Sequence, residues 1–254
     1  MTSNETYDAI VNAGIAKCCM DKDTLGARSM LAGMFIAIGC MMMLLVKSDS
    51  SLSPAVSAIL SGICFSAGLF SIFVCESELF TGDCLMIFGL IEEKYGISDM
   101  IRTLLLVLAH NISGAVFIAA FFMGCGMQNT FREAILAITE AKMAMGMHEL
   151  VARSILCNFL VCLGAWINAK STSVTEKMLA AAIPVTIFVS LGFEHSIANA
   201  FLYILMNTDP IWDLTRRLAS IFGNLVGGIL LFGTVQCASF VKTAKYGAKE
   251  VKNG

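Results

Sequence analysis

The 254-residue chain is 57% hydrophobic and 14% charged, carries a formal net charge of −2, and has a mean hydropathy of +0.78. Soluble domains carry about 25% charged residues, so this chain has too little polar surface to cover a water-soluble globule, and lipid is the solvent that explains the deficit. The slightly acidic balance argues against a nucleic-acid partner. The 10 cysteines include no C-x-x-C pair, so we expect neither a disulfide scaffold nor a metal site, and no cofactor.

Polar segments divide the chain into a short N-terminal part, two groups of three apolar runs, and a tail. The runs are 29–46, one that begins at Pro54, 104–122, 155–167, one that begins near Met178, and 218–232. A helix of about 20 residues crosses about 30 Å of hydrocarbon. We therefore expect an all-α membrane protein with an amphipathic cytoplasmic segment at 1–25, a first three-helix repeat at 26–124, an outer loop at 125–148, a second three-helix repeat at 149–241, and a cytoplasmic tail at 242–254.

Positive charges indicate the orientation of these spans. Most Lys and Arg residues fall in segments that share a side with the N-terminus, and the tail is basic. Because Lys and Arg are enriched on the cytoplasmic side of membrane proteins, we expect six spans with both termini in the cytoplasm. The expected location is the lipid bilayer of the cell's inner membrane.

Two of the apolar runs are interrupted by polar stretches that contain carboxylates. The second run breaks at CESELFTGD (75–83), and the fifth breaks at SLGFEHSIAN (190–199). The third and sixth runs each contain N-x-x-G, at Asn111 with Gly114 and at Asn224 with Gly227, and these glycines are expected to allow close helix packing. Three spans repeated once must be inverted, and inverted repeats with paired broken helices indicate a substrate site near the membrane midplane.

The polar residues at the breaks are the candidates for that site. An ionisable side chain at membrane depth is costly, which makes His195 a functional candidate; the alternative is a core histidine satisfied by a neighbour. Thr81 offers a hydroxyl that donates or accepts, unless it only caps a helix. Three amides lie inside apolar runs and either bond the interrupted backbone, line a pore, or join neighbouring helices: Asn111, Asn158 and Asn224.

Carboxylates and large apolar residues surround the same breaks. An anion path does not tolerate bare carboxylates, so Glu76, Glu78, Asp83 and Glu194 are expected to cap backbone N–H groups or to pair with Lys or Arg. Apolar residues beside a polar waist can gate a pore by dewetting; the alternative for each is ordinary packing. The candidates are Phe65, Leu69, Leu79 and Phe188.

Four segments together resemble the formate/nitrite transporter family. They are ESELFTG (76–82), LCNFLVCL (156–163), GFEHSIAN (192–199) and GNLVGG (223–228), and the match runs from AGIAK (13–17) to the end of the last span. The resemblance implies an aquaporin-like protomer with six spans and its own pore, assembled as a homopentamer. It also implies transport of formate, nitrite, lactate or hydrosulfide. The short chain and the TGD that follows ESELF favour the hydrosulfide branch, with formate and nitrite as the main alternatives.

The resemblance also implies roles for single residues. Phe65, Leu69 and Leu79 would form one constriction and Phe188 the other, with Thr81 and His195 facing the chamber between them. Asn158 and Asn224 would lie beside the pore, Lys142 would be an outer-vestibule lysine, and Glu194 would adjoin the histidine. A membrane redox subunit is the alternative from another class, because His110 and His195 could in principle ligate haem.

Overall fold

The computed structural model describes residues 1–240, and every regular element within that range is a helix. The elements are α1 (Ser3–Cys19), α2 (Lys22–Lys47), α3 (Pro54–Val74), α4 (Phe80–Asp83), η1 (Cys84–Met86), α5 (Ile87–Ile91), α6 (Ile97–Gly124), α7 (Met127–Thr130), α8 (Arg132–Ala144), α9 (Met147–Lys170), α10 (Val174–Ser190), α11 (Ser196–Met206), α12 (Pro210–Leu225) and η2 (Val226–Thr234). The expected tail at 242–254 lies outside the described residues.

Five helices in the described part of the chain are long and apolar enough to cross a membrane. They are Lys22–Lys47, Pro54–Val74, Ile97–Gly124, Met147–Lys170 and the continuous Pro210–Phe240, with mean hydropathies from 1.9 to 2.3 over their most apolar windows. A helix rises 1.5 Å per residue, so even the shortest reaches about 30 Å. Pro54 lies at the start of α3, as its fixed φ and missing N–H favour.

Two helical paths, those that begin with α3 and α10, are interrupted where the sequence predicted. The α3 helix ends at Val74 and helical structure resumes at Phe80, while α10 ends at Ser190 and α11 begins at Ser196. Each interruption contains one residue with a left-handed backbone, Glu76 with φ 51° and Gly192 with φ 67°. Glycine adopts this conformation freely and glutamate does not.

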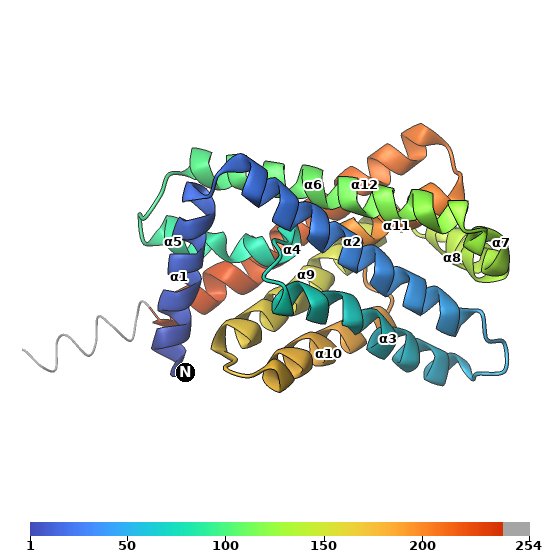
Figure 1. Ribbon diagram of the computed structural model, residues 1–254, viewed down its shortest axis with the longest axis horizontal. Coiled ribbons are helices and arrows are strands. Elements are labelled where there is room, and N and C mark those ends of the chain that lie inside the picture. Colours follow the sequence, from blue (N-terminus) through green and yellow to red (C-terminus); the bar gives the residue numbers. More distant parts are fainter. Residues whose placement is uncertain (241–254) are drawn as a thin grey trace, which may run out of the picture.

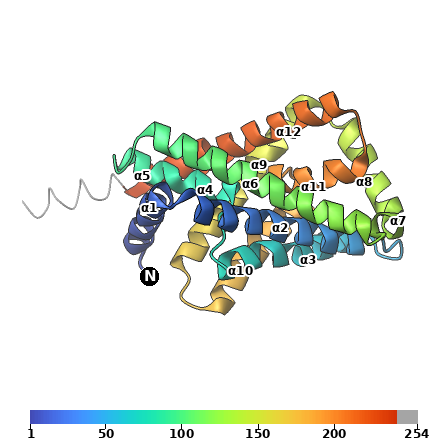
Figure 2. The same cartoon turned by 45° about the horizontal axis from the view of Figure 1, so that its top comes forward.

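The bundle has two distinct ends. In Figure 1 most of the long helices run roughly from left to right, α1 lies across the left end beside α5, and α7 and α8 lie at the right end near α11. The turned view in Figure 2 keeps α1 and α8 at opposite ends. The α3 helix packs on α10 and α2, and α9 packs on α10 and α12. We call the two ends the α1 mouth and the α8 mouth.

The structure shows a helix at the N-terminus, and two segments differ from those expected. Residues 3–19 form α1, with a capping box at Thr2 and Glu5, but α2 begins at Lys22 rather than after residue 25. The expected outer loop at 125–148 is largely helical, because it contains α7 and α8. Its apolar positions Ala134 and Ile135 are buried, so one face of α8 packs on the bundle.

The two N-x-x-G glycines allow neighbouring helices to touch. A Cβ atom on Gly114 would stand 2.0 Å from the Met30 carbonyl oxygen, and one on Gly227 would stand 2.0 Å from the Ile155 carbonyl oxygen. These distances leave no room for a side chain. Small residues at such crossings let helices pack closely in membranes, which is the role expected from the sequence.

Candidate functional site

Thr81 and His195, each from a different break, meet in the interior. Thr81 Oγ1 and His195 Nε2 are 3.1 Å apart, and the two residues are 0% and 3% exposed. Thr81 lies in the first turn after the first break, and His195 is the N-cap residue of α11. Residues 114 positions apart in sequence therefore form one polar contact between the two interrupted helical paths.

The helix cap fixes the tautomer of the neutral His195 ring. Its Nδ1 accepts a hydrogen bond of 3.2 Å from the Ala198 backbone N–H, so Nδ1 carries no proton there. The proton of a neutral imidazole must then sit on Nε2, which makes Nε2–H a donor toward Thr81 Oγ1. A second ring proton would fall on Nδ1 and break the cap, so the cap favours the neutral ring.

Asn111 clamps the first break to two neighbouring segments. Its Oδ1 accepts from the Phe80 backbone N–H at 2.9 Å. Its Nδ2 donates to the Ser29 carbonyl at 2.6 Å and to the Glu78 carbonyl at 2.9 Å. The amide thus satisfies two backbone groups at the interruption, the Phe80 N–H and the Glu78 carbonyl, and ties them to the Ser29 carbonyl of α2.

Asn224 clamps the second break with the same set of bonds. Its Oδ1 accepts from the Ser196 N–H at 2.9 Å, and its Nδ2 donates to the Ser154 carbonyl at 2.8 Å and the Glu194 carbonyl at 3.0 Å. Both donor hydrogens and the acceptor are therefore engaged with backbone. Asn224 is a structural clamp in this geometry, rather than a side chain that lines the cavities.

Asn158 joins helices instead of facing either mouth. Its Nδ2 donates to the Asn224 carbonyl at 2.7 Å and to Cys84 Sγ at 3.3 Å, and it is 0% exposed. This favours the helix-joining alternative that the sequence left open. Cys84, Cys157 and Cys162 are buried around it as free thiols.

A cavity of about 180 Å³ opens at the α8 mouth, and His195, Phe65, Phe188, Lys142 and Glu194 are among its lining residues. The Phe65 and Phe188 ring centroids are 5.9 Å apart. The Phe188 ring in turn lies nearly parallel to the His195 ring, with centroids 6.0 Å apart. The two phenylalanines therefore cover the polar contact on this side.

This arrangement corrects the expected grouping of the apolar residues. Phe65 packs against Phe188 and lines the same cavity, so the two lie on the same side of the molecule rather than on opposite sides. Leu69 and Leu79 instead line a separate cavity of about 400 Å³ at the α1 mouth. His195 lines the cavity of Phe65 and Phe188, and Thr81 follows two residues after Leu79.

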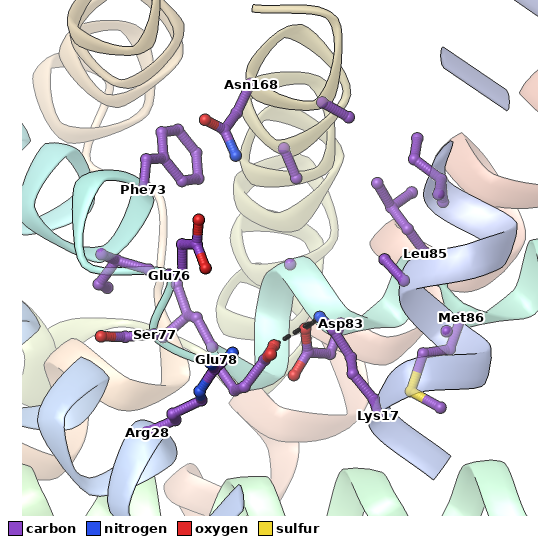
Figure 3. Close-up of a pocket in the computed structure, with 18 of the residues that line it drawn as sticks. Lys17, Arg28, Phe73, Glu76, Ser77, Glu78, Asp83, Leu85, Met86 and Asn168 are labelled. Carbon is purple, nitrogen blue, oxygen red and sulfur yellow. Dashed lines mark hydrogen bonds and ion pairs between the residues drawn. The ribbon is translucent and has the colours of Figure 1, made fainter. Parts of the chain in front are cut away.

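Each cavity holds one lysine paired with carboxylate at its break. At the α8 mouth, Lys142 Nζ lies 2.6 Å from both Glu194 carboxylate oxygens and donates to Asn199 Oδ1 at 2.9 Å. At the α1 mouth, Lys17 Nζ lies 2.6 Å from Glu78 Oε2 and also contacts Asp83 Oδ1 (Figure 3). The expected pairing of these carboxylates is confirmed, whereas Glu76 is exposed.

Lys17 is the residue that the sequence did not single out. It sits in the last turn of α1, and only the fold brings it to the first break. Burial alone would lower the pKa of Lys17, but the adjacent Asp83 and Glu78 charges outweigh burial and raise that pKa above its usual value. The lysine is therefore charged throughout the neutral range.

The sequence profile of the formate/nitrite transporter family matches residues 4–238. The chain belongs to this family. A formate channel of Escherichia coli strain K12, FocB, is 29% identical over 254 aligned residues that cover 89% of this chain and 90% of its own. Membership, together with the long apolar helices, makes this a multi-pass membrane protein.

Two solved structures in the same family have similar folds. A structure titled "FNT family ion channel" has a TM-score of 0.83 and 22% identity, and covers 93% of this chain and 99% of its own. A "Pentameric formate channel with formate bound" has a TM-score of 0.68 and 23% identity, with coverage of 89% and 96%. These likenesses establish the fold.

Proposed function

We propose that the chain forms a pore for small monovalent anions and that the Thr81–His195 contact is its central polar point. The observation that supports this most directly is the placement of that contact. His195 lines the α8 cavity together with Phe65 and Phe188, and Thr81 follows two residues after Leu79, which lines the α1 cavity together with Leu69. On this proposal Leu69 with Leu79 and Phe65 with Phe188 are the two constrictions.

The chemistry of the central pair suits an anion. Moving a charge out of water into an apolar neck costs several kcal/mol even after relaxation. His195 Nε2–H can donate to the anion, and the Thr81 hydroxyl can rotate to donate as well. Hydrogen bonds to a charged partner are worth about 1.5–3 kcal/mol each, so two donors offset much of that cost.

Formate is the anion we propose first. The relative and the ligand-bound structure named above are formate channels, whereas neither name mentions hydrosulfide, which the sequence favoured. Hydrosulfide and nitrite share the charge and roughly the size of formate. They remain candidates that a transport assay must rank.

The finer architecture belongs to the same proposal. We infer six crossings, with α3 to α5 and α10 to α11 as the two broken paths, in two inverted three-helix repeats. The matched clamps of Asn111 and Asn224 support this reading. The pentameric solved relative supports a homopentamer whose protomers each contain a pore, and no enzymatic step is part of the proposal.

The orientation with both termini in the cytoplasm of an inner-membrane protein has a direct test. Cys19 ends α1, and Cys125 follows α6 at the opposite end; both are exposed. Single-cysteine variants treated with a membrane-impermeant maleimide should label at Cys125 in intact cells and at Cys19 only after permeabilisation. Labelling of Cys19 in intact cells would reverse the orientation.

The haem alternative loses its ligands in this geometry. Both ring nitrogens of His195 have protein partners, and His110 Nδ1 lies 2.9 Å from the Leu106 carbonyl of its own helix. A histidine that ligates iron needs a free ring nitrogen. Of these two histidines, only His110 has a ring nitrogen available to ligate iron, so the pair cannot supply two axial ligands in this geometry.

A liposome flux assay tests the function. Purified protein in sealed vesicles should carry formate, nitrite and hydrosulfide faster than protein-free vesicles, whereas sulfate, which is divalent, should not cross. The matched variant Thr81→Val removes the hydroxyl with little change in shape and should slow all three anions. If wild-type flux equals that of protein-free vesicles, the anion-pore proposal is wrong.

A further inference from the structure

The ion clusters at the two mouths correspond in position but differ in charge. At the α8 mouth Lys142 contacts Glu194 and Asn199. At the α1 mouth Lys17 contacts Glu78 and Asp83. Asp83 follows Glu78 by the same five positions that separate Asn199 from Glu194. The α1 mouth therefore has a carboxylate where the α8 mouth has a neutral amide.

The formal charges of these clusters follow directly. One lysine and one glutamate sum to zero at the α8 mouth, whereas one lysine, one glutamate and one ionised aspartate sum to −1 at the α1 mouth. Asp83 is 3% exposed and lines the α1 cavity. Its Oδ2 is buried and has no hydrogen-bond partner among the described residues.

The remaining charged groups increase the difference between the cavities. The α1 cavity is lined by Lys17, Arg28, Lys177, Glu76, Glu78 and Asp83, which gives three positive and three negative charges. The α8 cavity is lined by Lys47, Lys142, Arg153 and Glu194, which gives three positive charges and one negative charge. Formal sums are thus zero and +2, and the α8 mouth is the more attractive to anions.

We propose that Asp83 makes anion conduction asymmetric, because its carboxylate lowers the positive charge of the α1 mouth at the place where the α8 mouth has the neutral Asn199. The proposal rests on the anion-pore function above and adds a residue that sets direction. A unit charge about 8 Å from an anion changes its local concentration about 2-fold in bulk water and about 30-fold at an effective dielectric constant of about 20. The aqueous cavity falls between these limits.

The asymmetry has a defined electrical consequence. Anions driven from the α8 mouth have crossed most of the transmembrane voltage before they reach Asp83. The voltage therefore strongly lowers the free-energy barrier to their passage. Anions driven from the α1 mouth reach Asp83 after crossing only a small part of the voltage, so the voltage lowers their barrier little. Current therefore rises more steeply with voltage when anions move from the α8 mouth to the α1 mouth.

Protons should tune the effect from one side. A proton bound to Asp83 or Glu78 neutralises the α1 cluster and makes its charge equal to that of the α8 cluster. Lys17 keeps its charge over the same range, and Arg28, Lys177 and Glu76 complete the charged groups that face Asp83 across this cavity. Acidification on the α1 side should therefore reduce rectification.

Single-channel recording in planar bilayers with symmetric sodium formate tests the proposal. The readout is the ratio of currents at equal positive and negative voltages, which needs no knowledge of how each channel is inserted. With both sides at about pH 8, the wild type should rectify by at least about 2-fold. Asp83→Asn should lower the ratio toward 1, and Asp83→Glu should retain the wild-type ratio.

A charge exchange separates this effect from general damage. The double variant Asp83→Asn with Asn199→Asp should restore rectification, whereas Asn199→Asp alone should reduce both the ratio and the conductance. If wild-type protein carries no formate current, the pore function itself fails. If it carries current but the ratio is the same in the wild type and in Asp83→Asn, the inference about Asp83 is wrong while the pore function stands.

Discussion

Substitutions of His195 test whether the central group acts as a donor or as a carrier of protons. The His195→Phe change removes both the Nε2 donor and the cap on the Ala198 N–H. A hydrogen bond to a charged partner is worth about 1.5–3 kcal/mol. If that stabilisation is lost at the highest barrier, formate flux should fall about 10- to 150-fold. Loss of the cap should lower stability by about 1 kcal/mol.

The His195→Asn change keeps both hydrogen-bonding functions without a group that titrates near neutrality. Asparagine is among the best N-cap residues, so its oxygen can accept from the Ala198 N–H while its amide donates toward the pore. We expect this variant to lose less flux than the Phe variant. Its pH profile should match that of the wild type, because the cap at Nδ1 favours a ring that stays neutral.

The assay is formate flux into liposomes over a pH series, with equal amounts of folded protein verified by size-exclusion chromatography. His195→Leu tests the loss of the donor without adding an aromatic ring, because Leu79 already occupies the N-cap of α4 without a side-chain cap. If the Asn variant loses a pH dependence that the wild type has, the ring carries protons and the donor-only reasoning is refuted. Full anion flux in the Phe variant would remove His195 from the mechanism.

Two further predictions concern the constriction and the helix crossing. Phe65→Ala and Phe188→Ala each open the same aromatic contact, so both should raise leak to a similar degree and the double variant should add little; unchanged flux and anion selectivity in both would indicate plain packing. Gly227→Val would place a side chain 2.0 Å from a backbone carbonyl and should lower the unfolding temperature in detergent, because overpacking costs about 1–3 kcal/mol or more. The same change at Gly124, which has nothing within 4 Å, should have little effect.

The sequence was sufficient to locate the breaks but not to determine which residues meet across them. A carboxylate-bearing stretch inside an apolar run is visible from composition, and both breaks occur there. The grouping of Phe65 with Leu69 and Leu79, which the resemblance implied, was wrong because Phe65 packs against Phe188. Phe188 lies four residues before the left-handed Gly192, whereas Phe65 lies 11 residues before Glu76, and the packing of α3 on α10 brings them together.

Amphipathic segments were the second source of error. The α8 helix carries Arg132, Glu133, Glu140 and Lys142 within 13 residues, so its composition indicates a loop even though one face is buried. The same holds for Lys17 in α1, which was placed correctly on a helix but without a partner. A surface helix does not reveal from its own residues which part of the bundle it covers, because that contact is made at long sequence separation.

The central site depends on how the two similar breaks differ from each other. The backbone at Leu79 has φ −114° and ψ 120°, and that at His195 has φ −102° and ψ 119°, so both positions begin a half-helix in nearly the same way. Two positions later the first break has Thr81 and the second has Ile197. The first break thus has an apolar residue at the N-cap and a polar one two positions later, and the second break has the reverse order. Neither alone provides two adjacent donors, and only their meeting places Nε2 3.1 Å from Oγ1. Replacement of either polar residue by its counterpart, His195→Leu or Thr81→Ile, therefore leaves a single donor in an otherwise apolar neck.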